Sequence, residues 1–272
     1  MKRIEETFRA LKVKKEKALI VYLTAGDPTL LKTEELILGL DRAGVDIVEV
    51  GVPFSDPTAD GPIIQAAAKR SLDGGANLPD IIRMIKRIRR VSEIPIVLFG
   101  YYNPIFIYGN EQFARKAKEA GVDGILVVDL PPEESAELRR YTDKAGIDYI
   151  SLIAPTSGGK RIGEIAGKAS GFLYYISITG VTGTATPQAE NVRTAVERIR
   201  KLTTLPVVVG FGISTPRQAA EIAPHADGVV IGSAFVRMIA EAGNAKDLVP
   251  GICRYAADIK RALKRRQTHG NG

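Results

Sequence analysis

The sequence predicts an α/β fold, a (β/α)8 TIM barrel formed by residues 1–272 as a single domain, with an extra helix at the N-terminus. Eight short apolar runs recur along the chain, and each is followed by a segment with helical polar–apolar periodicity. The runs are continuous and rich in β-branched residues, which is typical of parallel strands covered on both faces. No linker-like stretch divides the chain. An open doubly wound sheet is the alternative, and it is disfavoured because no GxGxxG motif opens the first unit.

The elements follow in a regular order. The chain begins with MKRIEETFRALKVKKEK, a charged amphipathic segment without the apolar centre of a signal peptide, which we expect to form the extra helix. The expected strands are 18–26, 45–51, 95–101, 124–129, 148–154, 172–177, 206–213 and 228–235. The expected helices between them include 30–44, 78–92, 110–120, 133–145, 189–202 and 247–265. Three helix ends read AGVD or AGID, at 43–46, 120–123 and 145–148, where the glycine can cap the helix in the left-handed conformation. The last residues, about 266–272, are expected to be a disordered tail.

The composition excludes several classes of protein. An apolar fraction of 45% and a charged fraction of 25% are ordinary for a globular protein, and no apolar run approaches the roughly 20 residues of a membrane helix. The Lys and Arg residues behind the net charge of +7 are mostly spread along helices with acidic neighbours. The dense basic groups at 86–90 and 260–272 lack interleaved aromatic residues, so we expect no nucleic-acid partner. The single cysteine, Cys253, permits no internal disulfide and is typical of a cytoplasmic protein.

Two kinds of catalytic chemistry are not expected from this sequence. His225 and His269 are the only histidines and neither follows a strand, so we expect no histidine-ligated metal. None of the eight apolar runs contains lysine, so a Schiff base is not expected either.

Glu49 places a carboxyl group inside the apolar run VDIVEVG. Side chains alternate along a strand, so we expect Val48 and Val50 to pack against the outer helices and Glu49 to point into the barrel. It lies near the carboxyl end of its strand, where barrel enzymes carry catalytic groups. A structural buried ion pair is the alternative, but none of the eight runs supplies a Lys or Arg.

Burial of Glu49 also predicts its chemistry. Hydroxyl groups such as those of Tyr102, Tyr174 or Ser177 could satisfy its side chain without neutralising it. Desolvation favours the protonated carboxyl, which suits a general acid that becomes a base later in the cycle.

Asp60 follows in the loop PFSDPTADGP, which three prolines stiffen over the same end of the barrel. Helix capping is the alternative role for an aspartate at this position. Two carboxyl groups at one mouth, one buried and one on a loop, can take different protonation states and divide acid–base work. Asp56 in the same loop is expected to be a turn residue.

Glycine-rich segments end the last two predicted strands. GFGIS (210–214) and IGSAF (231–235) both lead into helices, and this pair of loops commonly binds phosphate in barrels through backbone N–H groups and a helix N-terminus. A third segment, TGVTGTATPQAEN (179–191), is too long for a plain turn and is expected to form a mobile lid over the ligand.

The sequence resembles the alpha subunit of tryptophan synthase across nearly its whole length. The matching motifs are LTAGDP (23–28), VEVGVPFSDPTADGP (48–62), GYYNPI (100–105), VVDLPPEES (127–135), LIAPTS (152–157), SITGVTG (177–183), GFGIS and IGSAF. The resemblance implies a lyase that cleaves indole-3-glycerol phosphate to indole and D-glyceraldehyde 3-phosphate by a retro-aldol reaction. It implies that Glu49 protonates C3 of the indole ring and then takes a proton from the glycerol hydroxyl. Asp60 would accept the ring N–H and stabilise its positive charge.

The resemblance also implies the residues that bind the substrate. Tyr22 stands in the ring pocket where family members often have Phe, Tyr174 matches a tyrosine near Glu49, and Thr182 matches a threonine that holds the closed lid to Asp60. Ile178 stands where some members carry Arg. Tyr102 completes the expected substrate-binding set. The phosphate site is expected to comprise Gly183, Gly212, Gly232 and Ser233.

The family resemblance implies a partner as well. The alpha subunit pairs with a beta subunit in an α2β2 complex, and pyridoxal phosphate is bound by that partner and not by this chain. The 53–60 loop and the 179–191 lid would then communicate between subunits. A free-standing lyase, another phosphate-binding barrel enzyme such as an isomerase or indole-glycerol-phosphate synthase, and a non-enzymatic barrel with a decayed site are the alternatives. The synthase would be expected to use a barrel lysine, and both carboxylates and the phosphate glycines argue against decay.

Overall fold

The computed structural model describes residues 2–177, 189–210 and 212–264. In these residues nine parallel strands form one sheet in the order β5-β4-β3-β2-β1-β9-β8-β7-β6. The strands are β1 Ala18–Thr24, β2 Ile47–Gly51, β3 Ile96–Gly100, β4 Gly124–Val127, β5 Asp148–Tyr149, β6 Ser151–Ile153, β7 Leu173–Ile176, β8 Val207–Gly210 and β9 Gly228–Ile231.

The sheet closes on itself at Ile150. This residue alone separates β5, which pairs with β4, from β6, which pairs with β7. Its N–H donates to the carbonyl of Ile125 at 2.8 Å, so the chain continues the hydrogen-bonded ring through the break. The predicted fifth strand, 148–154, is therefore one run in two pieces, and the predicted barrel is confirmed over the open sheet.

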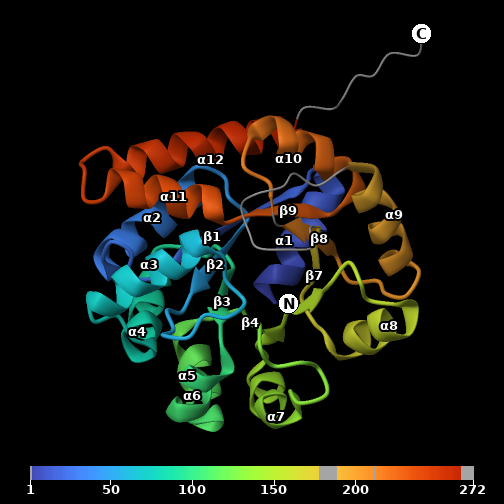
Figure 1. The fold of residues 1–272 in the computed structure, drawn as a ribbon, viewed down its shortest axis with the longest axis horizontal. Coiled ribbons are helices and arrows are strands. Elements are labelled where there is room, and N and C mark those ends of the chain that lie inside the picture. The colour runs from blue at the N-terminus through green and yellow to red at the C-terminus, as the bar shows by residue number, and fades with distance from the viewer. Residues whose placement is uncertain (1, 178–188, 211, 265–272) are drawn as a thin grey trace.

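Helices surround the strands on all sides (Figure 1). They are α1 Arg3–Lys14, α2 Leu30–Arg42, α3 Pro62–Asp73, α4 Leu78–Ile88, α5 Tyr102–Tyr108, α6 Asn110–Ala120, α7 Ala136–Ala145, α8 Gly159–Lys168, α9 Ala189–Arg200, α10 Pro216–Ile222, α11 Ser233–Ala242 and α12 Leu248–Lys264, with a 3-10 turn at Ala223–His225. The predicted helices are present with ends that differ by a few residues. The glycines of the three AGVD-like ends, Gly44, Gly121 and Gly146, all have positive φ, as expected for residues that end a helix.

Two apolar layers hold these elements together. Alternate strand residues such as Val48 and Val50 pack outward against the helices, in a cluster that extends around the barrel. The strand residues that alternate with these, such as Ile47 and Val97, point inward and fill the barrel interior. The interior layer also receives Ile4, Phe8 and Leu11 of α1, so the N-terminal helix closes one end of the barrel.

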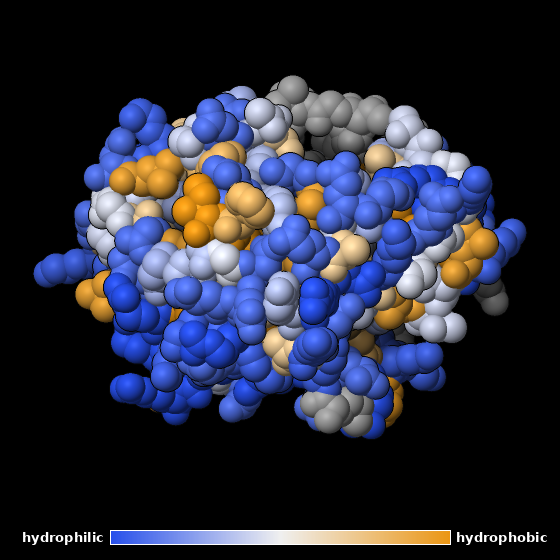
Figure 2. Space-filling model, turned by 90° about the horizontal axis from the view of Figure 1, so that it is seen from below, coloured by the Kyte–Doolittle hydropathy of each residue, from blue (hydrophilic) through white to orange (hydrophobic). Residues whose placement is uncertain are grey.

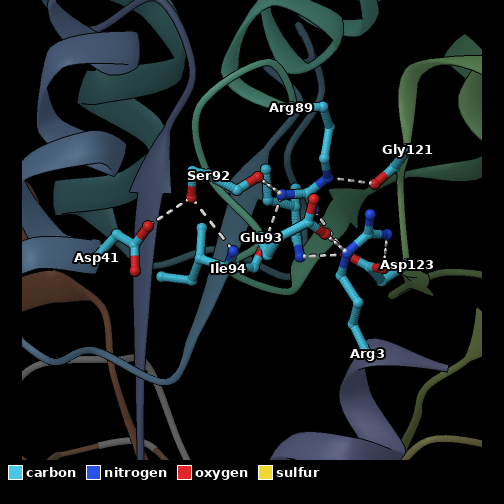
Figure 3. A network of polar contacts seen from close by, with 9 residues as sticks. Arg3, Asp41, Arg89, Ser92, Glu93, Ile94, Gly121 and Asp123 are labelled. Atoms are coloured by element: carbon cyan, nitrogen blue, oxygen red, sulfur yellow. Dashed lines mark hydrogen bonds and ion pairs between the residues drawn. The ribbon is translucent and has the colours of Figure 1, made fainter. Parts of the chain in front are cut away.

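A polar network fixes α1 to that end, which is the amino end of the strands (Figure 3). Asp123, just before β4, accepts from Arg3 Nη1 at 3.0 Å and from Arg89 Nη2 at 2.7 Å. Its Oδ2 also accepts the N–H of Ile96, the first residue of β3, at 2.8 Å. Glu93 pairs with Arg3 on the exposed side of the same network. The carboxylate therefore links the extra helix, α4 and two strand ends.

Asp46 connects the first strand, β1, to the last helix, α12, in a similar way. Its Oδ2 accepts from the N–H of Leu19 at 2.7 Å and from Lys260 Nζ of α12 at 2.5 Å. Lys260 also donates to the carbonyl of Lys17 at 3.2 Å. The catalytic candidates lie toward the opposite end of the strands, away from these ties.

Within residues 2–177, 189–210 and 212–264, every helix falls short of the length and apolar character that a membrane span requires. The predicted tail at 266–272 lies outside the described residues.

Candidate active site

Glu49 occupies the middle of β2 with its side chain inside the barrel. Its partners in the ladder are Tyr22 on β1 and Val97 on β3, and only 1% of Glu49 is exposed. The flanking Val48 and Val50 belong to the outer apolar layer. The inward orientation predicted from strand alternation is therefore confirmed.

The environment of Glu49 favours an uncharged side chain. Its Oε1 is buried without a hydrogen-bond partner among the described residues. Burial raises the pKa of Glu49 to about 8, and no cation in the described part of the chain offsets this effect. At neutral pH the protonated form predominates, so the carboxyl can donate a proton. A buried carboxyl oxygen without a partner is also open to a ligand.

Asp60 lies in the loop that follows β2 and is held by a tyrosine that the sequence reasoning missed. The hydroxyl of Tyr101 donates to Asp60 Oδ2 at 3.1 Å and accepts the N–H of Ala59 at 2.9 Å. The Tyr101 ring packs on Phe54 of the same loop, with centroids 5.2 Å apart. The Asp60 carbonyl accepts from Gln65 Nε2 of α3 at 2.8 Å. These contacts fix the loop at both of its ends.

The two carboxyl groups differ in protonation. Burial raises the pKa of Asp60 to about 6, and the hydrogen bond from Tyr101 acts in the opposite direction. At neutral pH Asp60 is mostly ionised while Glu49 is mostly protonated. One group can thus donate a proton while the other accepts a hydrogen bond from a ring N–H. Asp56, by contrast, is exposed: among the residues described its carboxylate accepts only from the neighbouring Ser55 hydroxyl, at 2.6 Å, and its carbonyl accepts the N–H of Thr58 at 2.9 Å.

Tyr102 does not join this pair, in contrast to the expectation from sequence. Its hydroxyl accepts from Asn110 Nδ2 at 2.8 Å, and its ring packs against the outer apolar layer. Tyr101 takes the place near Asp60. Alternation from Val97 through Phe99 already places Tyr101 on the inward face, so the signal was present in the period of the strand.

Tyr22 and Tyr174 line the barrel interior from β1 and β7. Each hydroxyl lies where a neighbouring strand ends in glycine: a Cβ on Gly51 would approach the Tyr22 oxygen to 2.2 Å, and one on Gly210 would approach the Tyr174 oxygen to 2.1 Å. Burial and the nearby charge of Glu49 raise the pKa of Tyr174. Ser177, a candidate partner for Glu49 from the sequence, donates to the Gly210 carbonyl at 2.6 Å.

The described part of the expected phosphate site lies at the ends of β8 and β9. Gly212 has φ of 77°, a conformation that favours glycine. Gly232 immediately precedes α11, and Ser233 is its first residue, so their N–H groups belong to the positive end of the helix. Thr182, Gly183, Ile178 and most of the predicted lid lie outside the described residues.

Among the residues that the structure describes, no group of three or more His, Cys, Asp or Glu side chains is arranged to hold a metal ion. The polar side chains of this mouth are instead carboxyl and hydroxyl groups, which suit proton transfer and hydrogen bonding.

Comparisons with known proteins agree on one family. The family model for the tryptophan synthase alpha chain matches residues 8–263. The tryptophan synthase alpha chain of Citrifermentans bemidjiense is 54% identical over 263 residues, which cover 97% of this chain and 98% of that protein. The alpha chain of Geobacter sulfurreducens is 51% identical over 263 residues, covering 97% and 99%.

Solved structures give the same result for the fold. Tryptophan synthase subunit alpha from Legionella pneumophila matches with a TM-score of 0.90 at 38% identity, over 97% of this chain and 98% of that one. An aminoacrylate-bound tryptophan synthase from Mycobacterium tuberculosis matches with a TM-score of 0.87 at 30% identity, over 97% and 100%. The chain therefore belongs to the tryptophan synthase alpha chain family.

Proposed function

We propose that this chain cleaves indole-3-glycerol phosphate to indole and D-glyceraldehyde 3-phosphate. The observation that carries the proposal is the buried Glu49 carboxyl, whose Oε1 has no partner among the described residues and whose pKa is raised to about 8. Breaking this carbon–carbon bond requires an electron sink, and the indole ring becomes one once C3 is protonated. Family membership and the position of Asp60 in the same mouth support this chemistry.

The reaction begins with the proton on Glu49. Transfer of this proton to C3 of the ring leaves a cationic indolium and a Glu49 carboxylate. The carboxylate then takes the proton of the hydroxyl on the adjacent side-chain carbon. The electrons of that O–H bond form the aldehyde C=O, and those of the breaking C–C bond return to the ring. Indole is released, and Glu49 is again protonated for the next turnover.

Asp60 stabilises the cationic intermediate. Its ionised carboxylate accepts the hydrogen bond of the ring N–H and lies opposite the positive charge that develops there. Tyr101 holds that carboxylate in position through its 3.1 Å hydrogen bond. The preorganised pair needs no rearrangement at the moment of protonation.

The phosphate of the substrate binds at the other side of the mouth. Gly212, Gly232 and Ser233 contribute backbone N–H groups, and the N-terminus of α11 contributes its dipole. Gly183 completes this binding on the basis of family resemblance, which also assigns Thr182 to holding the lid to Asp60. Tyr22 and Tyr174 form aromatic walls for the ring between the phosphate site and Glu49.

Substitution of the two carboxyl groups tests the proposal. Glu49→Gln removes the transferable proton at nearly constant shape, and the rate of indole release should fall at least about 10²-fold. Asp60→Asn removes the negative charge at the ring N–H, with an expected loss of about 10²-fold. Asp56→Asn in the same loop is the matched control and should retain the wild-type rate. Undiminished indole release by either of the first two variants would remove the proposed mechanism.

We also propose that the chain pairs with a beta subunit, in an α2β2 complex in which the partner holds pyridoxal phosphate. Phe106 and Ile107 of α5 are 59% and 76% exposed, which is unusual for adjacent large apolar side chains. Helix α5 directly follows Tyr101, so a partner bound there would contact the element that positions Asp60. Figure 2 views the side on which α5, α6 and α7 lie in Figure 1, and apolar residues gather there in a patch on a largely hydrophilic face.

Titration with the cognate beta subunit tests the pairing. We expect binding heat and an increased rate of indole release, both weakened by Ile107→Asp. Val91, equally exposed at 73% but on the turn after α4, provides the control substitution Val91→Asp. Turnover by the chain alone, unchanged by the partner, would instead support a free-standing lyase. A cytoplasmic location, expected for a chain with one cysteine, completes the proposal.

A further inference from the structure

Tyr22 is a buried titratable residue to which the chemistry above gives no role beyond a wall. It lies beside Glu49 in the ladder and is 6% exposed. Its ring meets Phe99 edge-on, with centroids 5.2 Å apart and an interplanar angle of 78°. Its hydroxyl occupies the space that a side chain on Gly51 would take. The phenol oxygen therefore lies inside the barrel, one layer beyond Glu49 toward the mouth.

The hydroxyl of Tyr22 has hydrogen-bonding capacity to spare. A phenol can donate one hydrogen bond and accept others. Within the described part of the chain its only hydrogen-bond partner is Thr24 Oγ1, at 3.4 Å, which is close to the limit for such a bond. Burial, and the charges of Asp60 and Glu49, raise the pKa of Tyr22, so the group stays protonated and remains a donor.

Apolar side chains pack against Tyr22 from the helices outside the strands. Tyr22 packs with Ala67 of α3 and Val236 of α11, and with the partly buried Ile63 and Phe99. We expect a ring placed between Glu49 and Asp60 to contact Tyr22, because Tyr22 is the ladder neighbour of Glu49 and its hydroxyl lies beside Gly51, at the start of the loop that carries Asp60. The surface that Tyr22 presents to the indole ring thus carries one polar atom, the phenol oxygen.

We propose, resting on the function above, that the Tyr22 hydroxyl is a specificity-determining group that favours indole rings bearing a hydrogen-bond acceptor on the six-membered ring. A hydroxyl substituent on the ligand replaces the long contact with Thr24 by a shorter bond, so little is lost when the partner changes. A phenylalanine at this position would offer the same aromatic surface without the donor.

Binding of simple ring probes tests this inference without requiring turnover. Isothermal titration would give dissociation constants for indole and for each hydroxyindole substituted on the six-membered ring, with the wild-type chain and with Tyr22→Phe. The measured quantity is the preference for hydroxyindole over indole in the wild type divided by that preference in the variant. For the best isomer we expect a ratio of about five, the value of one neutral hydrogen bond. Isomers that fit poorly do so in both proteins, so their misfit cancels.

Tyr175→Phe is the matched control, because Tyr175 is buried in the outer apolar layer and its substitution should leave every preference unchanged. A ratio near one for every isomer would overturn the inference, as would an equal effect of Tyr175→Phe. Indole release from indole-3-glycerol phosphate, measured in parallel, separates the two proposals. Cleavage with a ratio near one rejects only the role of Tyr22, whereas a ratio near five without cleavage rejects only the proposed function.

Discussion

Replacing Glu49 by Gln should make the protein more stable at alkaline pH while it removes activity. In the folded chain burial raises the pKa of Glu49 from 4.5 to about 8. Between these values the folded state keeps a proton that the unfolded state has lost. The free energy of unfolding therefore decreases as pH rises through this window and levels off above about pH 8. Gln carries no titrating proton, so the variant lacks this loss.

The magnitude follows from the two pKa values. A difference of about 3.5 pH units at about 1.36 kcal/mol each gives an upper limit of about 5 kcal/mol. Water entry and relaxation around the ionised carboxylate reduce the cost of burying it. We therefore expect Glu49→Gln to exceed the wild type by roughly 2 to 3 kcal/mol near pH 9 and by less than about 1 kcal/mol near pH 5.

Urea unfolding followed by circular dichroism, at several pH values across this window, measures the difference between the two proteins. Other titrating groups are common to both and cancel in the subtraction. A stability difference that stays constant from about pH 5 to about pH 9 would refute the reasoning. It would mean that Glu49 is solvated or paired in the folded chain, and the proton donor of the proposed mechanism would be lost with it.

Further predictions concern the neighbours of the two carboxyl groups. Tyr101→Phe removes the hydrogen bond that lowers the pKa of Asp60, which is about 6. The acid limb of the kcat/KM profile for indole release should therefore move up by about one pH unit. An unchanged acid limb would contradict the role of Tyr101. Gly51→Ala places a Cβ 2.2 Å from the Tyr22 oxygen and should cost about 1 to 3 kcal/mol in urea unfolding. Gly163→Ala, where a Cβ meets nothing within 4 Å, is the control; equal stabilities of these two alanine variants would argue against the packing described.

Strand alternation carried most of the successful sequence reasoning about the site. It placed Glu49 inside the barrel and Val48 outside, because a period of two leaves no other choice once one face is apolar. The same rule selects Tyr101, the first residue after β3, and not Tyr102. The strand ends at Gly100, and Tyr102 begins a short helix that turns its side chain outward. The period of the strand thus extends one residue past Gly100 to Tyr101, and the helix that begins at Tyr102 removes the Tyr102 hydroxyl from the position expected beside Glu49.

Other features lie beyond what local sequence patterns contain. The break at Ile150 depends on which neighbour each half of the run pairs with, and pairing is a property of the whole ring. The hydrogen bond between Tyr101 and Asp60 joins residues 41 positions apart, and the packing of Phe54 on Tyr101 likewise joins the loop to a residue far along the chain. Helix α5, in the segment YNPIFIY, has a proline and several aromatic and β-branched residues, so its composition does not favour a helix. The break at Ile150, the hydrogen bond between Tyr101 and Asp60 and the helical state of α5 are all determined by tertiary contacts.

The hydrogen bonds that connect Lys260 to the start of the barrel affect when this part of the chain can fold during translation. Its contacts with Asp46 and Lys17 bridge 214 and 243 positions of sequence. A ribosome that emits the chain from its N-terminus releases the two acceptors long before their donor. The first two strands therefore lack this contact until the chain has been translated as far as Lys260, and substituting Lys260 should slow the final step of refolding more than the early collapse.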